Sequence, residues 1–163
     1  MKKQTVILLL GVILATSANG QSLDSILTFK TFLCRDQRNA GTFLIHVNVY
    51  IRKGWSVVCA DQYGNALKSE PLTIIPIPER QKAAGVVILK GQDEYGSRVK
   101  FHRMYVYRDS VQVALRYGVH DRSRFPMEVR MLVSSTLLNA KGTAYNYVNS
   151  YMSTLRTDVG FCR

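Results

Sequence analysis

The sequence predicts an α+β domain, a mainly antiparallel sheet with one or two helices, and two patterns favour this class. Several segments alternate apolar and polar residues with a period of two, as half-buried strands do. The stretch 136–157 instead matches a short helix covering the sheet, with apolar residues at Leu137, Ala144, Val148, Met152 and Leu155. An all-β sandwich is the alternative, because Gly142 and the Thr, Asn and Tyr content of this stretch oppose a helix.

The first twenty residues have the composition of a secretory signal peptide. Two lysines precede an apolar run from Val6 to Ala15, and small residues follow at positions 18–20. The apolar run is too short to span a bilayer as a helix, and no later segment predicts a transmembrane span. We therefore expect residues 1–20 to be a cleaved leader and residues 21–163 to form a single secreted domain.

The first two elements after the leader are expected to be strands. Residues 26–34 are rich in strand-forming side chains. In the next segment one face carries five apolar residues, four of them β-branched: Phe43, Ile45, Val47, Val49 and Ile51. A helix capped by Gly54 is the alternative for this second segment, because Phe43, Val47 and Tyr50 also lie at helical spacing.

The middle of the chain predicts a short strand followed by two turns. The strand runs from Trp55 to Ala60. Two similar phrases, DQYGNALK at 61–68 and DEYGSRVK at 93–100, each contain a glycine suited to a tight turn, and we expect a hairpin at each. Between them, Pro76 and Pro78 confine their segment to a sheet edge or a loop, because proline cannot donate a ladder hydrogen bond.

Residues 98–107 and 111–117 both alternate and are expected to pair as a hairpin. A three-residue loop at 108–110 keeps all their apolar side chains on one face. The resulting register pairs Tyr107 with Val111, Tyr105 with Val113, and Phe101 with Tyr117. A further strand is expected over 127–133, where Met127, Val129, Met131 and Val133 alternate with polar residues.

The same register predicts a basic patch on the opposite face of this hairpin. It places His102 opposite Arg116 and brings Arg98 to His120, with Lys100 between them. Such a cluster could hold phosphates or an acidic partner, and we take Arg98, Lys100, His102, Arg116 and His120 as the candidate binding residues. The alternatives are an ordinary solvated sheet face and a ribonuclease site that uses His102, His120, Arg98 and Glu128.

The composition points to binding and offers no catalytic signature. The formal net charge is +11, of which two charges leave with the leader, and a basic surface attracts polyanions. The histidines and cysteines are dispersed, so neither zinc nor calcium spacing is present. Glycine-rich phosphate loops and catalytic-serine motifs are also absent from the sequence, and we expect no catalytic residue, metal or cofactor.

Three cysteines in an exported chain allow one internal disulfide, and three pairs are possible. We favour Cys34 with Cys162, because this bond would tie down a chain end that otherwise frays. The chain-entropy model gives about 4 to 5 kcal/mol for closing so long a loop. Cys59, within an apolar run, is then expected to be a buried small hydrophobic residue.

The leader, the early motif Phe32-Leu33-Cys34 and the lone Cys162 together resemble a known family. They are similar to the small secreted effectors of plant-pathogenic fungi, notably powdery mildews, which carry an aromatic-x-Cys motif. The resemblance implies a clasping disulfide and a ribonuclease-like fold with one helix on a curved antiparallel sheet. It also implies a non-enzymatic role on a host protein or RNA after translocation into a host cell.

The leading functional hypothesis is therefore a secreted, basic, non-enzymatic binding protein, with an effector as its narrower form. A secreted ribonuclease is the first alternative. An extracellular β-sandwich that holds an apolar ligand between its sheets is the second, since Val, Tyr and Met are abundant. The sequence does not predict the oligomeric state.

The disulfide is the first testable prediction. A peptide map of the mature protein, digested without reducing agent, is expected to contain a cross-linked pair of peptides carrying Cys34 and Cys162, because this pair ties both ends of the domain. The same digest after reduction should release the two peptides separately. A cross-link through Cys59, or to a second chain, would contradict the prediction.

Overall fold

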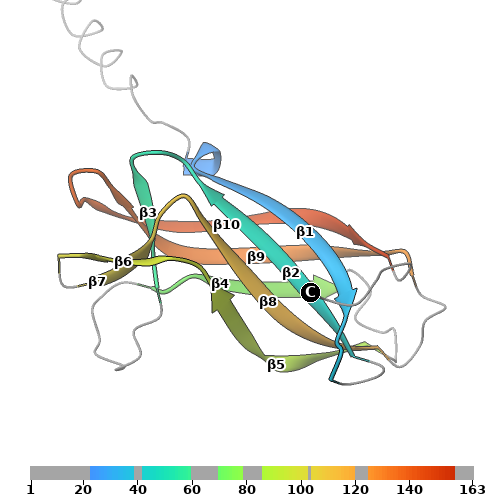
Figure 1. Ribbon diagram of the computed structural model, residues 1–163. Helices are drawn as coiled ribbons and strands as arrows, with labels where there is room; N and C mark the ends of the chain where they lie inside the picture. Colours follow the sequence, from blue (N-terminus) through green and yellow to red (C-terminus); the bar gives the residue numbers. More distant parts are fainter. Residues whose placement is uncertain are drawn as a thin grey trace, which may run out of the picture.

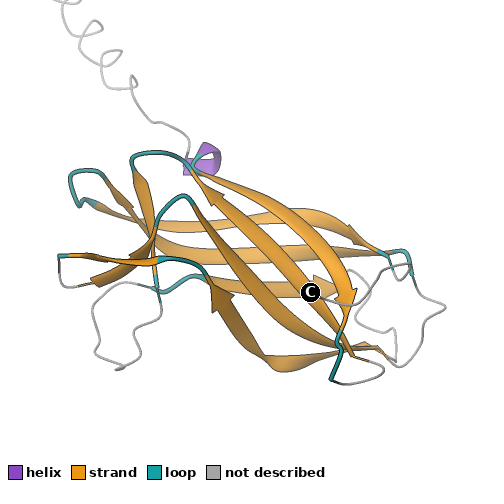
Figure 2. Ribbon diagram, in the orientation of Figure 1, coloured by secondary structure: helices purple, strands orange, loops and turns teal. Residues whose placement is uncertain are grey.

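The computed structural model describes residues 23–38, 42–59, 70–78, 86–102, 104–119 and 125–156. This part of the chain contains one short 3₁₀ turn, η1 (Leu23–Ser25), and otherwise strands and their connections (Figure 2). The strands are β1 (Leu27–Arg35), β2 (Thr42–Ile51), β3 (Trp55–Val58), β4 (Thr73–Pro78), β5 (Val86–Tyr95), β6 (Arg98–Phe101), β7 (Met104–Tyr107), β8 (Ser110–Val119), β9 (Met127–Asn139) and β10 (Ala144–Leu155).

The strands form two antiparallel sheets that pack face to face (Figure 1). Sheet A has the order β1-β2-β8-β5. Sheet B has the order β10-β9-β3-β7-β6, and β4 pairs with β9 beside this path. The architecture is an immunoglobulin-like β-sandwich, in which the inner faces of two sheets make the core. No helix in the described part of the chain has the length and apolarity needed to cross a membrane.

The predicted α+β class is therefore wrong, and the all-β alternative describes the fold. The segment expected to be a helix contains the end of β9 and the whole of β10. Along β10 the buried and partly buried side chains alternate with exposed ones, and Val148 and Met152 point outward with 76% and 48% of their surfaces exposed. Their spacing of four residues fits one face of a helix, but in β10 it only places both side chains on the outer face of the strand. The ribonuclease-like fold implied by the family resemblance is contradicted for the same reason.

The core confirms most of the predicted strands. The face of β2 that carries Phe43, Ile45, Val47, Val49 and Ile51 is buried, so the strand prediction was right and the helix alternative wrong. The sequence also indicated the other alternating core residues, which come from β8, beside β2 in sheet A, and from β9 in the opposite sheet: Val111, Val113, Leu115, Tyr117, Val129, Met131 and Val133. Burying these apolar side chains is the main force that holds the two sheets together.

The predicted pairing of 98–107 with 111–117 is wrong. Residues 98–107 are themselves a hairpin, in which β6 pairs with β7 through Arg98 with Tyr107 and Phe101 with Met104. Strand β8 follows β7 in the chain but lies in the other sheet, between β2 and β5. The extra turn begins at His102, whose φ is +55°. The turn places Val99 and Phe101 on the same face as Met104 and Val106, a shift of one residue from the predicted alternation. It stayed hidden because residues 104–107, MYVY, are apolar or aromatic at every position and fit either face of a strand.

The remaining turn predictions have different outcomes. The turn within 93–100 exists, but it connects β5 of sheet A to β6 of sheet B and so does not close a hairpin. The phrase at 61–68 lies outside the described residues. The segment with Pro76 and Pro78 is β4, which among the described strands pairs only with β9 and is therefore an edge, as the prolines predicted.

The structure tests part of what was predicted for the cysteines. Cys59 is a free thiol with 4% of its surface exposed, which confirms its expected burial. Burial raises the pKa of this thiol to about 11, so it remains protonated at neutral pH. Cys34 lies at 7% exposure in β1, and Cys162 is outside the described residues. The pair Cys34 and Cys162 stays a prediction.

Two isoleucines provide a matched test of the core. Ile45→Ala should lower the free energy of unfolding by about 2 to 5 kcal/mol, because Ile45 is fully buried and its truncation leaves a cavity. Ile75→Ala makes the same chemical change at a side chain that is 51% exposed, and should cost less than about 1 kcal/mol. Urea unfolding of both variants measures the difference, and equal losses would contradict the sandwich.

Candidate functional site

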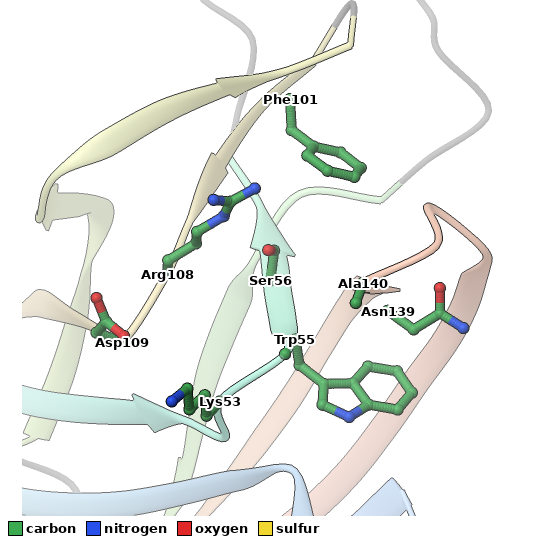
Figure 3. Close-up of a pocket in the computed structure, with 9 residues that line it drawn as sticks. Lys53, Trp55, Ser56, Phe101, Arg108, Asp109, Asn139 and Ala140 are labelled. Atoms are coloured by element: carbon green, nitrogen blue, oxygen red, sulfur yellow. The ribbon is translucent and has the colours of Figure 1, made fainter.

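A surface pocket of about 210 Å³ lies at one end of the sandwich, where three connections and the end of one strand meet (Figure 3). The β2–β3 turn, the end of β6, the β7–β8 connection and the β9–β10 turn supply its walls. Its lining residues are Lys53, Gly54, Trp55, Ser56, Phe101, Arg108, Asp109, Asn139 and Ala140.

Two local backbone features bring these connections together. Gly54 has a φ of +86°, a conformation that glycine adopts without strain, and the turn closes with the Trp55 amide donating to the Arg52 carbonyl at 3.0 Å. Asp109 has a φ of +63°, and its carbonyl accepts a 2.8 Å hydrogen bond from the Ile51 amide. The chain thus crosses from sheet B to sheet A beside the end of β2, which places Lys53 next to Arg108 and Asp109 at one opening.

Aromatic rings form part of the walls. Trp55 packs partly against the core and contacts Tyr145, with 5.4 Å between ring centroids. The guanidinium carbon of Arg108 lies 5.4 Å from the centroid of the Phe101 ring, and Figure 3 shows the two groups facing each other. This cation–π contact holds an otherwise mobile side chain at the pocket.

The pocket has cations available for a ligand. Neither Lys53 nor Arg108 forms an ion pair with a carboxylate of the described residues, although Asp109 lines the same opening. The hydroxyl of Ser56 lies in the middle of the pocket (Figure 3). Asn139 is committed elsewhere, because its Oδ1 accepts hydrogen bonds from the amides of Lys141 and Thr143 and so shapes the β9–β10 turn.

This arrangement is suited to binding an anionic group beside a flat or apolar one. Two cations and a hydroxyl can neutralise and hydrogen-bond a carboxylate, sulfate or phosphate, while Trp55 and Phe101 contact an apolar part. The described residues contain no group of three His, Cys, Asp or Glu side chains placed to hold a metal ion. Asp109 is the one carboxylate in the lining.

Arg98, the first of the predicted binding residues, has a structural role. Its Nε–H donates a 3.1 Å hydrogen bond to the Tyr107 hydroxyl, and its guanidinium lies 5.9 Å from the centroid of that ring. Tyr107 is fully buried, and burial raises the pKa of its phenol to about 12. Arg98 therefore gives a buried hydroxyl a charged hydrogen-bond donor.

Two other predicted residues flank Phe101 of the pocket in the sequence. Lys100 is exposed on β6 opposite Tyr105. His102 is exposed at the β6–β7 turn, with its ring edge-on to Phe101 at 4.6 Å and beside Gly142 of the β9–β10 turn. The neighbouring Phe101 places His102 at the rim of the pocket.

The structure does not group all five predicted residues. Arg116 belongs to β8 in sheet A, opposite Leu44, and pairs with Asp93 at 3.9 Å. His120 lies outside the described residues. The predicted contact of His102 with Arg116 is wrong, because β6 and β8 are in different sheets. A binding role for each residue stays a prediction.

The structure tests one pairing of the ribonuclease alternative, His102 with Glu128, while His120 lies outside the described residues. Glu128 lies at the start of β9, opposite Thr154, whereas His102 lies near the turn that follows the other end of this strand. At about 3.3 Å per residue the length of β9 separates them by roughly 30 Å or more. Two groups so far apart cannot act on one phosphate.

Sequence reasoning missed the pocket residues. Lys53, Trp55 and Arg108 were assigned to turns and strand ends with no functional role. One signal was available: the single tryptophan of the chain directly follows the turn glycine Gly54 and has a cation before it. Large aromatic residues at connections often contact partners, since loops held by a rigid sandwich carry binding residues.

The fold and the site together define an immunoglobulin-like β-sandwich domain with a cationic surface pocket. No model of a known protein family matches the chain, and no curated protein matches it significantly. Among solved structures, the N-terminal periplasmic domain of ScsB from Proteus mirabilis is similar, with a TM-score of 0.51 and 8% identity over 83% of this chain and 49% of that one. The chain thus spans about half the length of that protein, and the likeness concerns the fold alone.

A second solved structure is the reduced form of the DsbD N-terminal domain of Neisseria meningitidis. It has a TM-score of 0.49 and 11% identity over 82% of this chain and 89% of that one.

The assignment of Arg98 to the fold is testable against its neighbour. Arg98→Ala should lower the free energy of unfolding by about 1 to 2 kcal/mol, because the Tyr107 hydroxyl loses its charged donor. Lys100→Ala, on the same strand with an exposed side chain, should change it by less than about 0.5 kcal/mol. Chemical denaturation measures both, and a neutral Arg98→Ala variant would contradict the assignment.

Proposed function

We propose that this chain is an exported, non-enzymatic binding domain, and that its cationic pocket receives an anionic group of an acidic partner. The proposal rests on the combination of two cations, Lys53 and Arg108, with the rings of Trp55 and Phe101. Neither cation has a carboxylate partner among the residues that the structure describes. Export is proposed from the composition of residues 1–20.

Charge supports this choice of partner. The net charge of +11 attracts acidic molecules over long distances, and the cations at the pocket give the attraction a local target. Lys141 at the β9–β10 turn and His102 at the rim extend the basic surface around the opening. A single pocket fits one anionic group better than a long polyanion, which needs a continuous basic stripe.

The narrower hypothesis is an effector that acts on a host protein or RNA inside a host cell. It rests on the resemblance of the Phe32-Leu33-Cys34 motif and Cys162 to fungal effectors. The apolar-ligand alternative has less support, because the space between the sheets holds large buried side chains, including Tyr107, Tyr117 and Tyr147.

Trp55 provides the assay for the proposal. It is the only tryptophan and lines the pocket, so ligand binding should change the intrinsic fluorescence. Titration with a glutamate-rich peptide or a short single-stranded RNA at low salt should give saturable binding that weakens as salt rises. Lys53→Ala and Arg108→Ala should each weaken this binding about fivefold or more, since each removes one of the two cations that line the pocket.

Arg38→Ala is the matched control. Arg38 is an exposed cation in the connection after β1, at the opposite end of the sandwich, and its removal should leave binding within about twofold of the original. The proposal is wrong if neither probe changes the fluorescence of Trp55. It is also wrong if the Lys53 and Arg108 variants bind as tightly as the Arg38 variant.

A further inference from the structure

The outer face of sheet A is a second surface with a distinct composition. Its residues alternate along β1, β2, β8 and β5 with the positions that point into the core. The four strands lie side by side in one layer (Figure 1). Across them the register aligns one row of outward residues, Lys30, Asn48, Gln112 and Tyr95. The row spans about 14 Å, three inter-strand spacings.

Three aromatic side chains are exposed on this face. Tyr95 on β5, Phe32 on β1 and Tyr50 on β2 have 57%, 43% and 41% of their surfaces exposed. Phe32 is the aromatic residue of the Phe32-Leu33-Cys34 motif, and the core does not use its ring. Several large exposed aromatic groups on one sheet face indicate an interaction surface, because isolated exposed apolar residues are common but shared faces are not.

Polar groups with hydrogen-bonding capacity lie among these rings. Gln112 Nε2–H donates to Asn48 Oδ1 at 3.0 Å, and the two carboxamides together still carry further donors and acceptors. His46, in the next row, has 9% of its surface exposed and lies 5.0 Å from Phe32 between ring centroids. Neither of its ring nitrogens makes a hydrogen bond of standard length and angle, although the Gln112 side chain lies close enough to affect the pKa of the ring. A buried imidazole without a partner is costly, so a group that bonds to it would stabilise the site.

The charges of this face nearly cancel. Arg116 pairs with Asp93, and Lys30 lies over the Tyr50 ring at 5.6 Å from its centroid. The described outer-face residues therefore carry a net charge of one, in a chain whose formal net charge is +11. Burial lowers the pKa of His46, and this effect is larger than the opposing effect of the nearby Gln112 side chain. The lowered pKa keeps the imidazole neutral at physiological pH. The charge balance complements a neutral ligand and provides little attraction for a polyanion.

We propose that the outer face of sheet A binds a neutral polysaccharide or oligosaccharide. A pyranose ring presents a flat apolar face, which Tyr95, Tyr50 and Phe32 can stack against, and a rim of hydroxyls. The carboxamides of Asn48 and Gln112 are placed between the rings, where they can donate to and accept from such hydroxyls. This site is separate from the cationic pocket and does not depend on the function proposed for that pocket.

Affinity electrophoresis tests the proposal. The mature protein is run in native gels that contain a soluble β-glucan, a xylan or a galactomannan, with heparin gels and single-stranded RNA as polyanion arms. Retardation by at least one neutral polysaccharide is expected. Tyr95→Leu, Tyr50→Leu and Phe32→Leu keep apolar bulk but remove the flat ring, and each should weaken that binding about three- to tenfold.

Tyr105→Leu is the matched control, because Tyr105 is 51% exposed but belongs to β7 in sheet B. Its retardation should equal that of the original protein, and the pocket variant Lys53→Ala should also be unchanged. The proposal is overturned if no neutral polysaccharide retards the protein, or if only heparin or RNA does. It is also overturned if a variant that combines Tyr95→Leu, Tyr50→Leu and Phe32→Leu is retarded as strongly as the original protein.

Discussion

The contact between the inner faces of the two sheets is the constraint on which the rest of this domain depends. Residues such as Ile45, Val113 and Met131 have no exposed surface, and they meet only because sheet A and sheet B lie against each other. A sheet buries just one face, so each strand must turn its apolar residues inward and its remaining residues outward. The outward residues are then available for binding at no cost to the core.

The passage of the chain between the sheets creates the pocket. After β7 the chain does not return as a hairpin but crosses to sheet A, and the Asp109 carbonyl is held by the Ile51 amide at the crossing. Asp109 adopts a positive φ there, which few residues other than glycine, asparagine and aspartate do readily. This crossing brings Arg108 and Phe101 together with Lys53, which is distant from both in the sequence. The connection that completes the sandwich therefore also assembles the candidate site.

The basic residues of the chain have unequal roles. Arg98 holds the buried Tyr107 hydroxyl, and Arg116 balances Asp93 on the outer face of sheet A. Lys53 and Arg108 have no such partner among the described carboxylates and lie at a pocket. A high net charge alone does not distinguish these roles, because what separates them is the hydrogen bond or ion pair that each cation makes.

Local patterns in the sequence were enough to place most strands and their buried faces. The alternation in 43–51, 111–117 and 127–133 is a short-range property, and burial of one sheet face imposes it directly. Strand partners and the pocket were decided only by the tertiary structure. Residues 104–107, MYVY, are apolar or aromatic at every position, so the alternation did not reveal the two-residue turn after Phe101. Likewise, β10 has outward apolar residues that imitate a helix. Pairing between distant strands is selected by the packing of the whole core, which no single segment contains.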